Sequence, residues 1–220
     1  MIYFYMPVRK IKKSYISCVG YFKSYKNNKQ LAFESILERD FFTLLEFDKS
    51  VITFEEQPLK IKYQLETSTS RYTPDVLVVF ADGSKKIFEV KYQNDIDIDL
   101  ELQRKISVLK DTIAKQMSIP FEVFTDTQID KTYFKNCVFL YKSAFITDNK
   151  TMTSKVLEGI ENLFAPISIK SFLELLSQNP TEQLQILPYF WHQVFKNTSF
   201  VDMHQPLTMS SLLQPRNTYE

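Results

Sequence analysis

Apolar positions along the first two thirds of the chain follow either helical or strand-like spacing. Residues 33 to 45 carry apolar side chains at helical spacing, which predicts a helix from about Glu34 to Glu46. Residues 100 to 117 repeat that spacing and predict a second helix. Short apolar runs predict strands at 51 to 65 with a break at Pro58, at 76 to 80, at 84 to 92, at 121 to 124 and at 138 to 141. A hairpin is expected over residues 17 to 33, with its turn at Asn27-Asn28. The expected fold class is α/β, a mixed sheet flanked by helices.

The spacing of apolar positions changes near residues 142 to 155, and few strand-like runs follow. Helical spacing predicts helices at 153 to 163, 168 to 178 and 181 to 196, with Pro188 at the start of a new helix. Residues 199 to 201 and 207 to 209 predict a small β-wing around Pro206. We therefore expect two domains, 1–145 and 146–220, the second helical and winged-helix-like. The alternative is a small helical cap that only packs or dimerises.

Three residues carry the candidate chemistry: Asp75, Glu89 and Lys91, in the segment RYTPDVLVVFADGSKKIFEVKYQ. Two carboxylates can hold Mg²⁺, which prefers oxygen ligands. A lysine beside them can orient a water and stabilise the charge that develops on a phosphorane, as in a metal-dependent nuclease. The alternative interpretation is an exposed hairpin face with a cross-strand ion pair.

The register of the hairpin decides whether the two carboxylates can share a metal. A two-residue turn at Asp82-Gly83 would place Asp75 opposite Val90, on the wrong face. A three-residue loop, with Gly83 in the left-handed bulge position, pairs Phe80 with Ser84 and therefore Asp75 with Glu89. We predict the second arrangement. Glu89 and Lys91 then share a face, and Val90 points into the core.

Composition excludes several classes of site. The chain has only 3 glycines and no Gly-rich phosphate loop. With two cysteines far apart and two histidines, a tetrahedral zinc site is improbable, and the cysteines are expected to be reduced packing residues of a cytosolic protein. No apolar run approaches the length of a membrane span, so no membrane partner is expected.

Charge is distributed unevenly, although the net charge is only +1. Residues 1 to 33 contain no acidic residue, and their basic residues alternate with aromatic ones. This pattern favours contact with a nucleic-acid backbone, and the alternative is a solvated basic edge. The candidate DNA-binding residues are Arg9, Lys10, Lys12, Lys13, Lys23, Lys26 and Lys29.

Several ordered blocks resemble the TnsA family, the endonuclease subunits of heteromeric cut-and-paste transposases. They are FESILERDFFTLLEFDKSVITFEEQPLKIKY, RYTPDVLVVF with the following DG and FEVK, and IPFEVFTD, and they span roughly residues 17 to 141. The segment FWHQVFKNTSFVDMHQPLTMSSL looks like the winged-helix tail of that family. The resemblance implies a restriction-endonuclease-like fold and a Mg²⁺-dependent site, in which Mn²⁺ is expected to substitute.

Carried over from the family, the helix glutamate falls on Glu38, the strand aspartate on Asp75 and the lysine on Lys91. Glu34 is a rival for Glu38, and a helix-surface charge is the alternative role for Glu38 itself. Glu89 stands where some members have glutamine. The resemblance thus implies Glu38, Asp75, Glu89 and Lys91 as catalytic residues, and Glu38, Asp75, Glu89 and the Val90 carbonyl as metal ligands.

The resemblance also implies partners. TnsA proteins cut the 5′ ends of the transposon, a DDE-type transposase, TnsB, cuts and joins the 3′ ends, and an AAA+ regulator, TnsC, contacts TnsA. The chain is as short as members from CRISPR-associated transposons, and the bacterial cytoplasm is the expected location. Two other functions stay open from the sequence: a stand-alone restriction or repair nuclease, and a non-catalytic adaptor between DNA and a partner.

Overall fold

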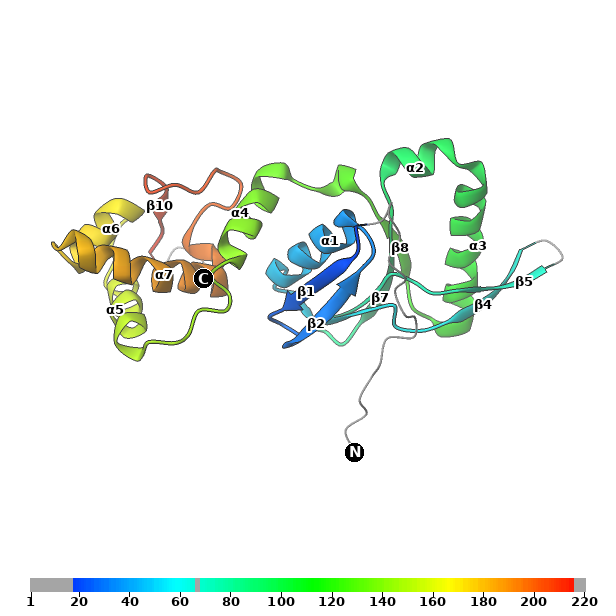
Figure 1. Ribbon diagram of the computed structural model, residues 1–220, viewed down its shortest axis with the longest axis horizontal. Coiled ribbons are helices and arrows are strands. Elements are labelled where there is room, and N and C mark those ends of the chain that lie inside the picture. The colour runs from blue at the N-terminus through cyan, green and yellow to red at the C-terminus, as the bar shows by residue number, and fades with distance from the viewer. Residues whose placement is uncertain (1–17, 66–67, 216–220) are drawn as a thin grey trace, which may run out of the picture. The chain divides into compact units, whose positions relative to one another are not determined.

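The structure is a computed structural model that describes residues 18–65 and 68–215, which form two compact units (Figure 1). The units divide between Ile129 and Asp130, earlier than the expected boundary at 145/146. The shift arises because residues 138 to 141, expected as a strand, end helix α4 (Lys131–Tyr141) of the second unit. The Asp130 side chain accepts hydrogen bonds from the backbone amides of Thr132 and Tyr133 in the first turn of this helix, and so caps its start.

A four-stranded mixed sheet forms the centre of the first unit, in the order β3-β6-β7-β8. The strands are β3 (Val51–Glu56), β6 (Val76–Phe80), β7 (Lys85–Val90) and β8 (Phe121–Phe124). Neighbouring strands are antiparallel except for β7 and β8, which are parallel. This confirms the expected mixed sheet.

One face of the sheet is covered by helix α1 (Ile36–Phe47). The ring of Phe41 packs on Phe88 of β7 and stacks on Phe124 of β8, with centroids 5.0 Å and 4.3 Å away. The predicted hairpin is present as β1 (Gly20–Ser24) and β2 (Lys29–Phe33), joined by a turn in which Asn28 has a φ of 49°.

The other face is covered by helix α3 (Leu100–Met117), so that β7 and β8 lie between α1 and α3 (Figure 1). A separate hairpin, β4 (Ile61–Leu65) and β5 (Ser68–Tyr72), packs on α3. The shared core contains Ile61, Tyr63, Tyr72, Ile87, Leu109, Ile113 and Phe121. Strand β5 was not expected because its sequence, STSRY, is almost entirely polar. Helix α2 (Gln93–Ile98) was not expected because it buries no residue.

The β6–β7 hairpin has the predicted three-residue loop. The Phe80 amide donates to the Ser84 carbonyl at 2.9 Å, and Gly83 has a φ of 81°. Pairing of Val76 with Phe88 continues this register, so Asp75 falls opposite Glu89. Glycine suits this loop because an L side chain is strained at such a φ.

The second unit is helical, with α5 (Lys150–Glu161), α6 (Ile169–Leu176) and α7 (Pro180–Lys196). Pro188 lies inside α7, which corrects its expected place at a helix start. Proline has no amide hydrogen, so a backbone carbonyl in the preceding turn loses its hydrogen bond. The Pro188 side chain is exposed, so water can reach that carbonyl instead.

The predicted wing strands are also wrong. Residues 198 to 200 form a short 3₁₀ turn, η2 (Thr198–Phe200), and residues 207 to 209 form no strand. The short sheet that does form pairs β9 (Ile167–Ser168), which precedes α6, with β10 (Leu212–Leu213). In the part of the chain that the structure describes, no helix has the length and apolar character to cross a bilayer.

Candidate active site

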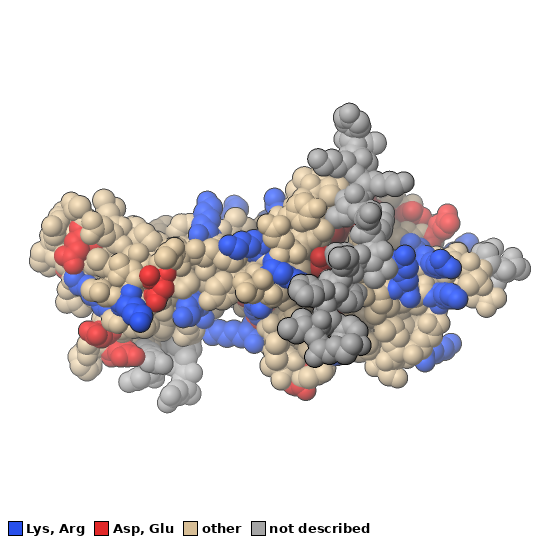
Figure 2. All heavy atoms as spheres, turned by 60° about the horizontal axis from the view of Figure 1, so that its bottom comes forward, with Lys and Arg blue, Asp and Glu red and all other residues tan. Residues whose placement is uncertain are grey.

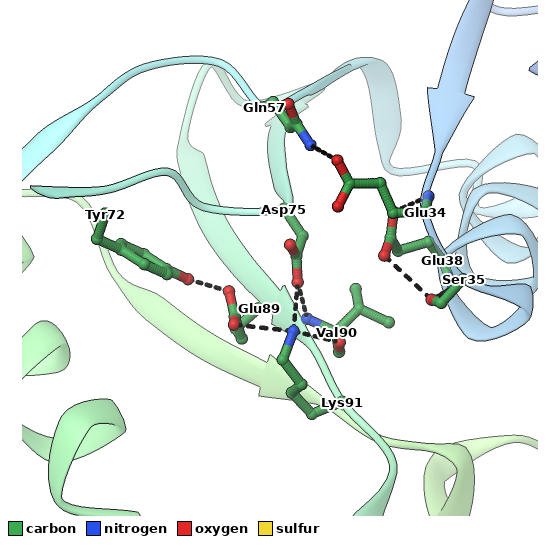
Figure 3. A network of polar contacts seen from close by, with 9 residues as sticks. All are labelled: Glu34, Ser35, Glu38, Gln57, Tyr72, Asp75, Glu89, Val90 and Lys91. Carbon is green, nitrogen blue, oxygen red and sulfur yellow. Dashed lines mark hydrogen bonds and ion pairs between the residues drawn. The ribbon is translucent and has the colours of Figure 1, made fainter. Parts of the chain in front are cut away.

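Three oxygen atoms converge on the ammonium of Lys91 at the end of β7 (Figure 3). The Lys91 Nζ lies 3.3 Å from Asp75 Oδ2, 3.0 Å from Glu89 Oε1 and 3.2 Å from the Val90 carbonyl oxygen. The sequence predicted this grouping of Asp75, Glu89 and Lys91, and the structure brings all three together. Val90 is buried on the opposite side of the strand, as expected.

The strands and their hydrogen bonds fix both carboxylates. Asp75 directly precedes β6, and its Oδ2 accepts the backbone amide of Val90 at 2.8 Å. Glu89 lies within β7, is 4% exposed and accepts the hydroxyl of Tyr72, the last residue of β5. Burial, reinforced by the charges of Glu89 and Asp75, raises the pKa of the Tyr72 hydroxyl, so it stays protonated and donates. The hairpin β4–β5 therefore holds one of the two carboxylates in place.

Burial and neighbouring charges shift the pKa of Asp75 and of Lys91 in different ways. Burial raises the pKa of Asp75, and the neighbouring Glu89 carboxylate raises it further. Burial by itself lowers the pKa of Lys91, but Asp75 and Glu89 more than offset this, so the net pKa is raised. The lysine is therefore held as a cation, and it compensates two carboxylates that would otherwise repel each other.

Glu38 lies at the start of α1 and lines the same pocket as Val90 and Lys91. Its carboxylate closes the first turn of the helix: Oε2 accepts the Glu34 amide at 2.8 Å and Oε1 accepts the Ser35 hydroxyl at 3.0 Å. Ser35 in turn accepts the Glu38 amide at 3.1 Å. Burial and the nearby Asp75 raise the pKa of Glu38 to about 7. Glu38 thus belongs to the site, and both of its oxygens are engaged within its own helix start.

Glu34, the rival for that position, reaches the site from another direction. Its Oε1 accepts the side-chain amide of Gln57 at 3.0 Å (Figure 3). Gln57 itself has a φ of 45°, and its backbone amide donates to the Asp75 carbonyl at 2.9 Å. A non-glycine residue in this conformation is uncommon and is held here by bonds at both ends. Gln57 therefore ties the start of α1 to the residue before β6.

The residues present suit a divalent cation, as judged from the donor set. The described residues contain no cluster of three or more His, Cys, Asp and Glu side chains that could hold a metal ion. The oxygens of Asp75, Glu89 and Val90 nevertheless converge on one positive charge, the Lys91 ammonium, which stands in for a cation. An all-oxygen set of this kind suits Mg²⁺ or Mn²⁺. Glu38, predicted as a further ligand, has no direct bond to this set.

The candidate DNA-binding residues fall into two groups. Arg9, Lys10, Lys12 and Lys13 lie outside the described residues. Lys23 and Lys29 are exposed on β1 and β2. Lys26 is half-buried, and its ammonium donates to the carbonyls of Asp48 and Val51 at 2.5 Å and 2.6 Å.

Sequence reasoning missed two polar residues of the site, Tyr72 and Gln57, and misjudged Cys18. Tyr72 stands three residues before Asp75, but nothing in the spacing shows that a tyrosine on a separate hairpin reaches Glu89. The role of Gln57 depends on a left-handed backbone that no local signal predicts. Cys18, expected as a packing residue, is exposed and lines the pocket, whereas Cys137 is buried.

A mixed sheet with a carboxylate before one strand, a glutamate on the next and a lysine just after it defines a restriction-endonuclease-like nuclease. Two family models match the chain: TnsA-like endonuclease N terminal over residues 48–126 and TnsA endonuclease C terminal over residues 128–203. The chain belongs to the TnsA endonuclease family. Asp75, Glu89 and Lys91 lie within the first match, and Glu38 lies before it. No curated protein matches the sequence.

Membership makes the chain a transposon endonuclease and implies a Tn7-like transposition complex with DNA and other Tns subunits.

Proposed function

We propose that this chain cuts DNA with a divalent metal, Mg²⁺ or Mn²⁺, held by Asp75, Glu89 and the Val90 carbonyl. The observation that supports this most is the convergence of these three oxygens on one cationic atom, Lys91 Nζ. When bound, such a metal polarises a phosphoryl oxygen and lowers the pKa of a bound water. Glu38 is proposed as a further ligand because it faces the same pocket.

The residues of the chain have separable tasks in this proposal. Asp75 is fixed by the Val90 amide and Glu89 by the Tyr72 hydroxyl, so both carboxylates are oriented before any substrate arrives. Lys91 stays protonated and lies at the open end of the strand, on the pocket, where its ammonium can meet a scissile phosphate. A fixed positive charge at that place stabilises the negative charge that develops on the phosphorane.

The first test of the proposal is the choice of metal. We expect cleavage in Mg²⁺ and in Mn²⁺, because both ions accept an all-oxygen ligand set in octahedral geometry. Ca²⁺ is larger and more loosely coordinated, so it should support DNA binding with little turnover. The measurement is the rate of strand cleavage in each ion. Efficient cleavage in Ca²⁺ alone, or undiminished cleavage in a chelator, would contradict the proposed metal-dependent mechanism.

We further propose that the cut falls at the 5′ ends of the transposon and that a DDE transposase, TnsB, and an AAA+ regulator, TnsC, direct it. With a net charge of only +1, the chain offers local phosphate contacts rather than a broad electrostatic footprint. Position on the DNA must then come from partners.

This proposal predicts that the chain alone cuts DNA poorly and without sequence preference. The measurement is end cleavage of a supercoiled donor plasmid, with and without the transposase and ATPase subunits. Cutting at the ends should appear only with the partners. Site-specific cutting by the chain alone would favour a stand-alone nuclease. Partner-dependent assembly without any cutting, together with intact transposition of the 3′ ends, would favour a non-catalytic adaptor.

A further inference from the structure

The β4–β5 hairpin has one buried face and one basic face. It forms a two-stranded sheet of its own, which extends past α3 (Figure 1). Ile61, Tyr63 and Tyr72 point into the core with α3. Side chains alternate along a strand, so the opposite face carries Lys62 and Gln64 of β4 and Thr69 and Arg71 of β5. All four are exposed, and none is apolar.

Two positive charges lie directly opposite each other on this basic face. Lys62 and Arg71 are cross-strand partners in the hairpin register. Like charges at such positions destabilise a sheet. No described acidic side chain forms an ion pair with either residue. Elsewhere in the unit a lysine on a strand is neutralised, since Lys86 forms an ion pair with Glu122 at 2.8 Å. Among the described residues, the hairpin thus keeps a like-charge pair without an acidic partner at a cost to its own stability, which favours an external anion.

Further basic side chains lie near the hairpin. Lys60 is exposed just before β4. On the other face of the hairpin, the Lys105 ammonium of α3 lies 5.1 Å from the centre of the Tyr72 ring. Lys and Arg side chains gather at the end of the unit that the hairpin and α3 form (Figure 2).

The basic face lies close to the candidate active site along the chain. Asp75 follows Arg71 by four residues, a length of chain that spans at most about 14 Å. Nucleotides of one DNA strand rise about 3.4 Å each along the helix axis. An anion bound at Arg71 therefore lies within a few nucleotides of a phosphate at Lys91. Tyr72, between the two, bonds to Glu89.

We propose that the outward face of the hairpin, centred on Lys62 and Arg71, binds the phosphate backbone of the DNA next to the cut. The proposal rests on the proposed function, since it assigns the path of the same substrate. Cations with amide and hydroxyl groups are the donors that proteins use for phosphate oxygens. A protein partner would instead need an apolar centre, and this face has none.

The test is the salt dependence of DNA binding by the whole chain, measured by fluorescence anisotropy on a short duplex in a chelator. We expect Lys62→Ala/Arg71→Ala to bind more weakly at low salt. The slope of log K against log salt should become shallower by about 0.9 for each lost contact, so by roughly 1.8 in all. Because the repulsion is removed, the melting temperature should stay the same or rise. A charge-preserving exchange, Lys62→Arg/Arg71→Lys, should keep the wild-type slope.

The matched control is Lys131→Ala/Lys135→Ala, which removes two exposed lysines one turn apart on α4. An unchanged slope in the hairpin variant, or an equal loss in the control, would overturn the proposal. So would a wild-type chain without salt-dependent binding, or a loss that comes only with a lower melting temperature. Normal DNA binding with lost transposase-dependent cutting would assign the face to a protein instead. The binding assay contains no metal, so its result does not depend on cleavage. A chain that binds DNA through this face but never cuts it would contradict the nuclease proposal and still support DNA binding by the hairpin.

Discussion

Replacing Asp75 by asparagine is expected to abolish strand cleavage while leaving the fold intact. Asparagine keeps a carbonyl oxygen that can accept the Val90 amide, so the local hydrogen bond survives. It removes the negative charge that a metal needs, and the rate should fall by more than about 10²–10³-fold, the loss typical of one electrostatic group. Burial and Glu89 both disfavour the charged form of Asp75, so the melting temperature in a chelator should hold or rise.

Asp82→Asn is the matched control, because Asp82 is exposed in the loop of the same hairpin and its hydrogen-bond partner is Ser84 of the same turn. It makes the same chemical change outside the site and should cut at the wild-type rate. The assay is end cleavage with partner subunits present, with circular dichroism to confirm the fold. A wild-type rate in Asp75→Asn would mean that the site has been assigned to the wrong residue.

Replacing Lys91 by alanine should lower the chemical rate by about 10²–10³-fold at saturating metal, because the charge that faces the phosphorane is lost. Metal binding should be no weaker, since the ammonium and a metal would use the same three oxygens. Without metal, the variant leaves the buried Glu89 and the half-buried Asp75 carboxylates uncompensated and should melt at a lower temperature than the wild type. Adding Mn²⁺ should raise its melting temperature more than that of the wild type.

Lys85→Ala, at the exposed start of β7, controls for the loss of a lysine beside the same strand. Arginine at position 91 should not restore the rate fully, because a planar fork replaces a compact charge. The two measurements are single-turnover cleavage and thermal melting with and without Mn²⁺. A Lys91→Ala chain that binds metal poorly but cuts normally once saturated would contradict the role given to this lysine.

The sequence predicted the parts of the site that depend on local geometry. A period of two along β7 places Glu89 and Lys91 on one face, and the Gly83 loop sets Asp75 opposite Glu89. The apolar spacing also predicted a helix from about Glu34, and α1 begins at Ile36. These features need only neighbours in sequence and the pairing that a tight turn imposes.

The predictions that were wrong concern segments whose structure depends on contacts with distant parts of the chain. Strand β5 is polar and is held by its pairing with β4 and by Tyr72 in the core, so its own pattern carries no strand signal. Residues 138 to 141 read as a strand because VFLY is apolar throughout, which periodicity cannot assign over so short a run. Pro188 is tolerated within α7 because the helix is exposed there, which the sequence does not show.

The closed first turn of α1 would affect how readily the proposed metal site binds its ion. In the proposed metal site, Glu38 would bind the ion less readily while its two oxygens hold the Glu34 amide and the Ser35 hydroxyl. Releasing a cap of this kind costs about 1 kcal/mol, which is roughly a fivefold loss in affinity for the incoming ion. The closed helix start would thus weakly oppose metal binding. DNA or a partner that unwinds this turn would free Glu38. Cleavage would then depend on assembly of the complex and not only on the metal supply.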